Sequence, residues 1–126
     1  MAADKRKILL VEDEKMLSSM YATKFAKEGY ELIQAYDGEE GLTKAKSIKP
    51  DVILLDIIMP KLDGFVVLKA LKQDPELKKI PVILLTNLGQ DEDIRKGKEL
   101  GADDYFIKAN HTPAEVVDKA KAFFEK

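Results

Sequence analysis

Short apolar runs alternate along the chain with longer segments in which apolar residues recur at helical spacing. Five runs are predicted to be strands: Ile8–Val11, Tyr30–Ala35, Val52–Leu55, Val82–Leu85 and Tyr105–Ile107. Three of them are continuously apolar, which is typical of central parallel strands buried on both faces by helices. The second run alternates more than the others, so we expect it at an edge of the sheet.

In three of the expected helices, apolar side chains fall on one face, and we expect these three faces in the core. The residues concerned are Leu17, Met20, Tyr21, Phe25, Phe65, Leu68, Leu71, Val116, Val117, Ala120, Phe123 and Phe124. The last helix has a start signal: Thr112 as N-cap, Pro113 at the first helical position and Glu115 at the third.

Strand and helix alternate as five βα repeats with no linker between them. This pattern predicts a single α/β domain over residues 1–126. Because crossover connections are right-handed, the sheet is expected to be doubly wound, with helices on both faces.

Composition narrows the kind of protein and the kind of site. The chain has 126 residues, of which 45% are apolar and 35% charged, as in soluble globular proteins. No apolar run approaches the length of a membrane helix, and residues 1–7 lack the features of a secretory signal, so we expect a cytoplasmic protein. The net charge is −2 and the lysines are scattered, which gives nucleic-acid binding no support.

Polar side chains stand where the predicted strands end, and ligands of such sheets bind outside those carboxyl ends. They are Glu12, Asp13 and Glu14 after the first strand, Asp56 after the third, Thr86 and Asn87 after the fourth, and Lys108 after the fifth. Each alone has an ordinary explanation, as a helix start, a loop cap or a solvated charge. Together they indicate a site, because like charges ~4 Å apart repel by about 4 kcal/mol at intermediate dielectric and so require a cation.

The cation that fits this cluster is Mg²⁺. The chain has no cysteine and only one histidine, His111. We expect His111 to be an ordinary loop residue. A metal must therefore be held by oxygen ligands. Hard carboxylate ligands suit Mg²⁺, which is typically shared with a phosphate. Lys108 can supply a second cation to a phosphate oxygen.

Other phosphate sites fit the sequence less well. A flavin phosphate would be repelled by the acidic loop after the first strand. A haloacid-dehalogenase-type phosphohydrolase needs a second aspartate two residues after the first, where this chain has Ile58. No Gly-rich dinucleotide fingerprint or P-loop is present.

Four segments carry a resemblance to a known family: ILLVEDE at 8–14, DVILLDIIMPKLDG at 51–64, PVILLT at 81–86 and GADDYFIK at 101–108. Over essentially its whole length the chain resembles the receiver domain of the two-component response-regulator family and is chemotaxis-regulator-like. The resemblance implies a flavodoxin-like (βα)₅ three-layer sandwich, with a five-stranded parallel sheet of order 2-1-3-4-5.

The resemblance also implies roles for the residues of the site. Asp56 is the phosphoacceptor, Lys108 pairs with the phosphoryl group, and the Thr86 hydroxyl and the Asn87 backbone amide bind its other oxygens. Tyr105 is the switch residue, an aromatic side chain whose rotamer follows the state of Thr86.

A second set of roles concerns the metal. The resemblance implies that Asp13, Asp56 and the Ile58 backbone carbonyl ligate Mg²⁺, with Glu12 acting mainly through water. Asp63 and Gly64 are expected to be structural, the glycine permitting a turn before the third helix.

The chain departs from the family pattern next to the lysine, where members usually carry proline and this chain has Ala109. We therefore expect either a trans bond with a reshaped loop or a strained cis bond. Asn87 replaces a residue that is usually small, so its side chain either narrows access to the phosphate or adds a hydrogen bond. Ile58 and Leu88 are apolar at positions where relatives place polar side chains beside the attacking water, and this predicts slow autodephosphorylation.

The resulting prediction is a phospho-switch and not a turnover enzyme. A phosphohistidine of a sensor kinase or of a phosphotransfer protein would donate to Asp56. The surface of the fourth helix, fifth strand and fifth helix would then favour a downstream effector or a homodimer partner. An alternative is a receiver-like interaction module that acts without phosphorylation, and a metal-dependent phosphatase is the weakest alternative because a general acid is missing.

Overall fold

The computed structural model describes residues 6–123. The strands are β1 (Lys7–Val11), β2 (Glu31–Ala35), β3 (Val52–Leu55), β4 (Val82–Thr86) and β5 (Asp104–Ile107). The helices are α1 (Lys15–Lys27), α2 (Gly38–Ile48), α3 (Gly64–Gln73), α4 (Asp91–Glu99), the 3₁₀ helix η1 (Lys108–Asn110) and α5 (Pro113–Lys121). Every predicted strand is present, with boundaries within one residue of the prediction.

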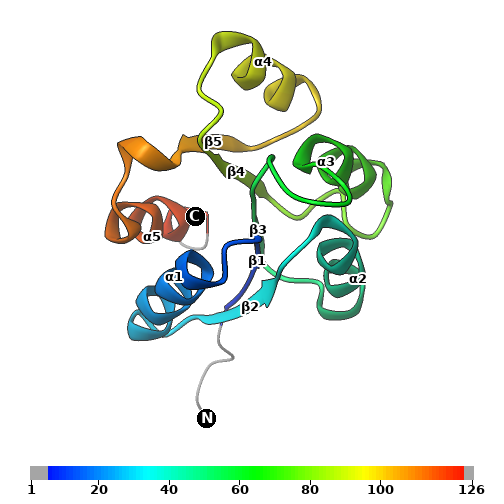
Figure 1. Cartoon of the computed structure of the whole chain (residues 1–126). Helices are drawn as coiled ribbons and strands as arrows, with labels where there is room; N and C mark the ends of the chain where they lie inside the picture. The colour runs from blue at the N-terminus through cyan, green and yellow to red at the C-terminus, as the bar shows by residue number, and fades with distance from the viewer. Residues whose placement is uncertain (1–5, 124–126) are drawn as a thin grey trace.

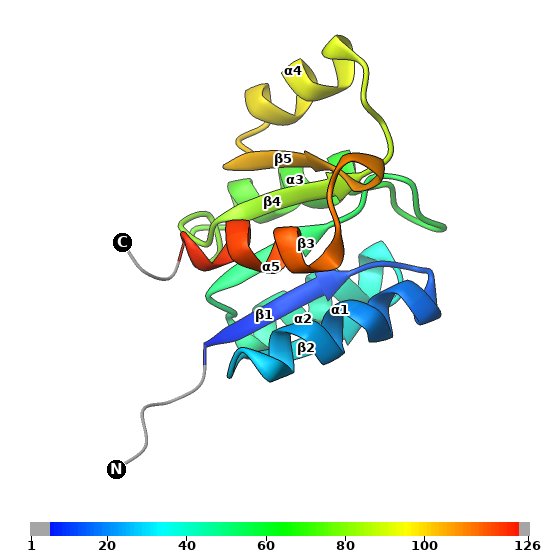
Figure 2. The ribbon, with the colours of Figure 1, turned by 90° about the vertical axis from the view of Figure 1, so that its left-hand side faces the viewer.

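All strand pairs are parallel, and the order is β2-β1-β3-β4-β5. The flavodoxin-like doubly wound fold is therefore confirmed, including the edge position of the second strand. Helices α1 and α5 cover one face of the sheet, and α2 and α3 cover the other (Figures 1 and 2). Because every strand points the same way, the carboxyl ends of all five lie along one edge.

The core has two parts, one on each face of the sheet. On the face of α1 and α5, the helix residues Tyr21, Phe25, Val116 and Val117 pack against the strand side chains that point toward these helices. The second cluster, on the face of α2 and α3, is built from Ala45, Val67, Leu68 and Leu71 and the alternate side chains of the same strands. Burial of both faces explains why these strands are continuously apolar.

Two of the expected core residues need comment. Met20 is 44% exposed, so its prediction as core is wrong. The buried stripe of α1 runs through Ser18, Tyr21 and Phe25 at the three- and four-residue spacing of a helix face, and Met20 lies one position off it. Phe124 lies outside the described residues.

Side-chain caps fix where three helices begin. The Asp37 carboxylate accepts from the Glu40 amide at the start of α2, and Asp63 accepts from two amides of α3. The start signal predicted for α5 is confirmed as a capping box formed by Thr112 and Glu115. No helix among residues 6–123 has the length and apolar character needed to span a membrane.

Candidate functional site

The acidic residues meet where β1 and β3 end. Val11 pairs with Leu55, so the next residues of the two strands, Glu12 and Asp56, are neighbours. The Asp56 amide donates to the Val11 carbonyl at 3.0 Å, and the Glu12 amide donates to the Ala35 carbonyl at 2.9 Å. Regular strand pairing thus continues up to the residues that carry the carboxylates.

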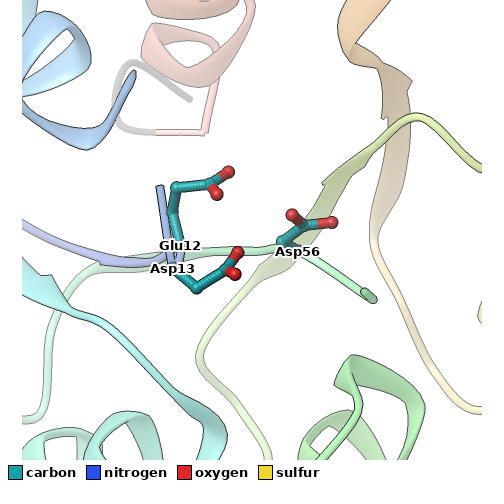
Figure 3. A group of neighbouring side chains, drawn as sticks. All are labelled: Glu12, Asp13 and Asp56. Atoms are coloured by element: carbon teal, nitrogen blue, oxygen red, sulfur yellow. The ribbon is translucent and has the colours of Figure 1, made fainter. Parts of the chain in front are cut away.

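Three carboxylates form one cluster at this edge (Figure 3). Glu12, Asp13 and Asp56 each offer an oxygen that lies within 4.8 Å of the others. Glu12 is 1% exposed and Asp56 is 6% exposed, whereas Asp13 is exposed to solvent. Burial of two carboxylates at this separation requires a nearby positive charge.

Lys108 supplies that charge from the end of β5. Its ammonium contacts Glu12 Oε1 and lies 2.8 Å from Asp56 Oδ2. Burial lowers the pKa of Lys108, but the hydrogen bonds to Asp56 and Glu12 and the negative charges of these two carboxylates together outweigh this effect, and the net pKa is raised. Burial raises the pKa of Glu12, and the bonds from Lys108 and from the Glu14 amide oppose this rise.

Backbone amides orient the two buried carboxylates. Asp56 Oδ1 accepts from the Ile57 amide at 2.7 Å and from the Ile58 amide at 3.3 Å. Glu12 Oε2 accepts from the Glu14 amide at 3.0 Å. With Oδ1 held by the backbone and Oδ2 by Lys108, the Asp56 carboxylate has a fixed orientation at the site.

The donor set fits a divalent cation. Three carboxylates against the one ammonium of Lys108 leave a net charge of −2 (−3 + 1). Asp13 is the member of the cluster that has no ion pair within residues 6–123, and it faces solvent. Hard oxygen ligands, two excess negative charges and access from solvent match Mg²⁺.

The cluster opens into a depression of about 250 Å³. It is lined by Glu12, Asp13, Glu14, Asp56, Ile58, Asn87 and Lys108. The predicted acceptor, lysine and acidic residues are therefore brought together, along with Ile58 and Asn87. Glu14, which follows the first strand in the same acidic run, also lines the depression, although no role in the site was predicted for it.

Thr86 and Tyr105 are not in the lining of this depression, and both contact Leu88. Thr86 is fully buried at the end of β4, and its hydroxyl oxygen is 3.5 Å from the Leu88 amide. The Tyr105 hydroxyl donates to the Leu88 carbonyl. The two residues predicted to switch together thus contact the same peptide segment, and their roles remain predictions.

The loop after Lys108 adopts the first of the two expected conformations. No cis peptide bond occurs among residues 6–123, and Lys108–Asn110 forms a 3₁₀ turn. The Ala109 amide donates to the Asn87 side-chain oxygen at 3.1 Å. Of the two effects considered for the Asn87 side chain, an added hydrogen bond is present, and the residue also lines the depression.

Gly64 has a different role from the one predicted. Its φ is not positive, since the positive-φ glycines of the described chain are Gly29 and Gly101. A Cβ atom at Gly64 would lie 2.2 Å from the Asp56 carbonyl oxygen and 2.6 Å from Ile57 Cα. Glycine is therefore needed for close approach of α3 to the acceptor strand, and only the tertiary structure reveals this.

Tyr21 is a second residue near the site that the sequence placed only in the core. Burial raises its pKa, and the charges of Lys108, Glu12 and Asp56 also act on its phenol. The buried Tyr21 side chain on α1 therefore lies within electrostatic range of the charged cluster. No sequence motif indicated that Tyr21 lies near the functional site.

Comparison with known proteins agrees with this geometry. The family model described as "Response regulator receiver domain" matches residues 8–121. The alkaline phosphatase synthesis transcriptional regulatory protein PhoP of Bacillus subtilis is 41% identical over 121 residues, covering 96% of this chain and 49% of PhoP. The regulator RpaA of Synechocystis is 40% identical over 102 residues, covering 81% of this chain and 42% of RpaA. The chain thus spans less than half the length of these two relatives.

Solved structures show the same likeness. A putative response regulator from Chloroflexus aurantiacus superposes with a TM-score of 0.89 at 30% identity, covering 98% of this chain and all of that one. The chemotaxis protein CheY4 of Vibrio cholerae gives a TM-score of 0.88 at 30% identity, with 95% and 99% of the two chains covered. From the match over residues 8–121 and from the acidic cluster beside a lysine, we conclude that the chain belongs to the receiver domain family of two-component response regulators.

Proposed function

We propose that this receiver accepts a phosphoryl group on Asp56 and uses the modification as a switch. The observation that carries the proposal is the environment of Asp56: it is 6% exposed, its Oδ2 lies 2.8 Å from the Lys108 ammonium, and two further carboxylates share its site. A carboxylate fixed in this way beside a cation is suited to nucleophilic attack on phosphorus.

The transfer is written as an in-line displacement. A carboxylate oxygen of Asp56 forms the new O–P bond while the P–N bond of a phosphohistidine breaks. The bonding pair of that bond leaves with the imidazole nitrogen, which requires no oxidant or further reactant. The product is an aspartyl phosphate on this chain and a free histidine on the donor.

The chain's own groups neutralise the charge that collects on the phosphoryl oxygens. Lys108 already contacts the acceptor carboxylate, so an oxygen attached there lies within its reach. Mg²⁺, bound by Asp13 and Asp56 with the Ile58 carbonyl, and by Glu12 through water, would add two positive charges to the site. The Asn87 amide and the Thr86 hydroxyl would bind the remaining oxygens.

The switch follows from the contacts of Thr86. At 3.5 Å its hydroxyl makes a weak contact with the Leu88 amide, so little is lost when the hydroxyl turns toward a phosphate. The Leu88 carbonyl holds the Tyr105 hydroxyl, so a shift of this loop changes the environment of Tyr105 on β5. The surface formed by α4, β5 and α5 would then change its affinity for an effector or a second copy.

The donor in this proposal is a phosphohistidine on a sensor kinase or a phosphotransfer protein. The receiver catalyses its own modification and its own dephosphorylation, and it is not a turnover enzyme. Receiver domains as a family interact with histidine kinases and effectors, and several relatives of this chain are transcriptional regulators.

The test is intact mass after incubation with acetyl phosphate and Mg²⁺. The parent protein is expected to gain one phosphoryl group, and Asp56→Asn is expected to gain none. Asp118→Asn, an exposed aspartate on α5, is the matched control and should label like the parent. Equal labelling of Asp56→Asn would overturn the assignment, and an unlabelled parent would favour an interaction module that works without phosphorylation.

A further inference from the structure

The Asn87 side chain joins two strand ends of the site. Asn87 follows Thr86 directly at the end of β4, and its Oδ1 accepts a hydrogen bond of 3.1 Å from the Ala109 amide. Ala109 follows Lys108 directly after β5. One hydrogen bond therefore links the peptide segments that carry the predicted phosphate ligands Thr86 and Lys108.

This hydrogen bond holds the backbone just after β5, where pairing with β4 no longer fixes the path of the chain. Strand pairing ends with Thr86 beside Ile107, and the chain then turns away through Lys108–Asn110. The turn is closed by a bond of 3.3 Å from the His111 amide to the Lys108 carbonyl. His111 supports it from the α5 side through ring contact with Phe106.

Asn87 supports the same turn from the β4 side. The Lys108 backbone must sit correctly, because its side chain reaches back over the sheet edge to Asp56 and Glu12. A proline at position 109 has no amide hydrogen and could not make this bond. The asparagine after Thr86 is thus the acceptor of this hydrogen bond, and the non-proline residue after Lys108 is its donor.

We propose that Asn87 is a positioning residue whose side-chain oxygen holds the backbone beside Lys108 and thereby keeps the ammonium on Asp56. Its effect on phosphorylation is indirect and passes through Lys108. The inference rests on the proposed phosphoryl transfer to Asp56, and it assigns to the Asn87 side chain a task separate from that of its backbone amide.

The first test compares Asn87→Ala with Asn110→Ala. Asn110 lies in the same turn, is exposed, and its side chain makes no hydrogen bond within residues 6–123. Asn87→Ala should slow phosphorylation by acetyl phosphate about fivefold, the factor that matches one hydrogen bond of ordinary strength. Asn110→Ala should react like the parent.

A spectroscopic readout separates positioning from general loss of structure. In protein labelled with ¹⁵N-lysine, the Lys108 ammonium signal is assigned by its loss in Lys108→Met. The signal should shift or broaden in Asn87→Ala and stay unchanged in Asn110→Ala, while both variants keep a cooperative thermal transition. An unchanged Lys108 signal and a parental rate in Asn87→Ala would overturn the proposal.

A second test removes the donor of the bond. In an Ala109→Pro background, Asn87→Ala should not slow phosphorylation further, because the hydrogen bond is already absent. In an Ala109→Gly background, which keeps the amide, Asn87→Ala should slow phosphorylation by the full factor. Equal effects in both backgrounds would contradict the proposal. If the parent is not labelled at Asp56 the proposed function fails, while the Lys108 signal still tests the link to Asn87.

Discussion

Lys108 and Asp56 are 52 positions apart in the sequence, yet the lysine ammonium lies 2.8 Å from the aspartate carboxylate. The same ammonium contacts Glu12, so one cation serves two carboxylates that are both almost fully buried. This arrangement offsets part of the negative charge at the acceptor and orients its carboxylate before any phosphodonor binds. The stability of the domain and the chemistry of its site therefore depend on the same lysine.

Replacing Lys108 with methionine should destabilise the domain by about 3 kcal/mol in metal-free buffer at neutral pH, because two buried carboxylates lose their counter-charge. The loss should shrink as the pH is lowered, because burial raises the pKa of Glu12 and a protonated Glu12 needs no counter-charge. Urea denaturation at a series of pH values measures both effects. Lys79→Met, at an exposed loop position, is the control and should be neutral. A pH-independent loss in Lys108→Met would contradict the explanation.

Mg²⁺ should raise the thermal midpoint of the parent. An ion that binds only the folded state, present at a free concentration of ten times its Kd, adds about 1.4 kcal/mol of stability. Asp13→Asn should abolish this rise, since Asp13 is the carboxylate of the cluster exposed to solvent and free of an ion pair within residues 6–123. Glu14→Gln is the control, because its backbone amide still donates to Glu12. Equal Mg²⁺ responses in Asp13→Asn and the parent would exclude Asp13 as a ligand.

Gly64→Ala should destabilise the domain by about 3 kcal/mol, because the added methyl group would lie 2.2 Å from the Asp56 carbonyl oxygen. Since that contact is with backbone, α3 or the acceptor segment must shift, and phosphorylation should slow as well. Gly29→Ala is the matched control: its φ is +88° and no atom lies within 4 Å of the new Cβ. It should cost about 1 kcal/mol through backbone strain alone and leave phosphorylation unchanged. Equal costs by chemical denaturation would refute the steric account.

The phosphorylated protein should lose its phosphoryl group slowly. Ile58 is 58% exposed at the mouth of the depression, where an apolar side chain gives an attacking water no hydrogen-bond partner. Ile58→Asn should accelerate the decay, measured by intact mass after removal of acetyl phosphate. Val66→Asn, at an exposed apolar position of α3 that does not line this depression, serves as control. Fast decay of the parent, or decay of Ile58→Asn no faster than the parent, would count against this explanation.

Much of the fold was predictable because it depends on local patterns. Strand Val52–Leu55 has the predicted limits, since an apolar run between polar residues allows little choice of boundary. The meeting of Glu12, Asp13 and Asp56 was predictable as well, because parallel strands bring their carboxyl ends to one edge. The strand limits follow from the apolar run, and the meeting of the carboxylates follows from the parallel direction of the strands.

The features that sequence could not predict depend on contacts between distant segments. The trans turn at Lys108 is held by a hydrogen bond between residues 22 positions apart, Asn87 and Ala109, and no local pattern indicates it. The need for glycine at position 64 comes from the approach of α3 to Asp56. Met20 was assigned to the core because a helical spacing of three or four residues leaves the edge of the buried stripe undefined.

Tyr105 should make the stability of the domain fall at alkaline pH. Burial, with the charges of Asp93 and Asp56, raises the pKa of Tyr105 to about 12, from about 10 for an unperturbed tyrosine. Between these values the unfolded chain releases the phenolic proton while the folded chain keeps it. The stabilisation is therefore fully present below about pH 10 and is lost as the pH rises through about 12.

Tyr105→Phe tests this, because phenylalanine cannot ionise and also cannot donate to the Leu88 carbonyl. The variant should be less stable than the parent by about 1 kcal/mol at neutral pH, and the difference should close above pH 10 and reverse in sign as the pH approaches 12, because only the parent loses stability there. Tyr36→Phe, which removes a hydroxyl bonded to Gln34, is the control and should leave the Tyr105 contribution in place. Denaturation curves across this range, with phenolate absorbance recorded in parallel, measure both quantities. A gap that stays constant up to pH 12 would show that the Tyr105 proton is not retained by the folded state.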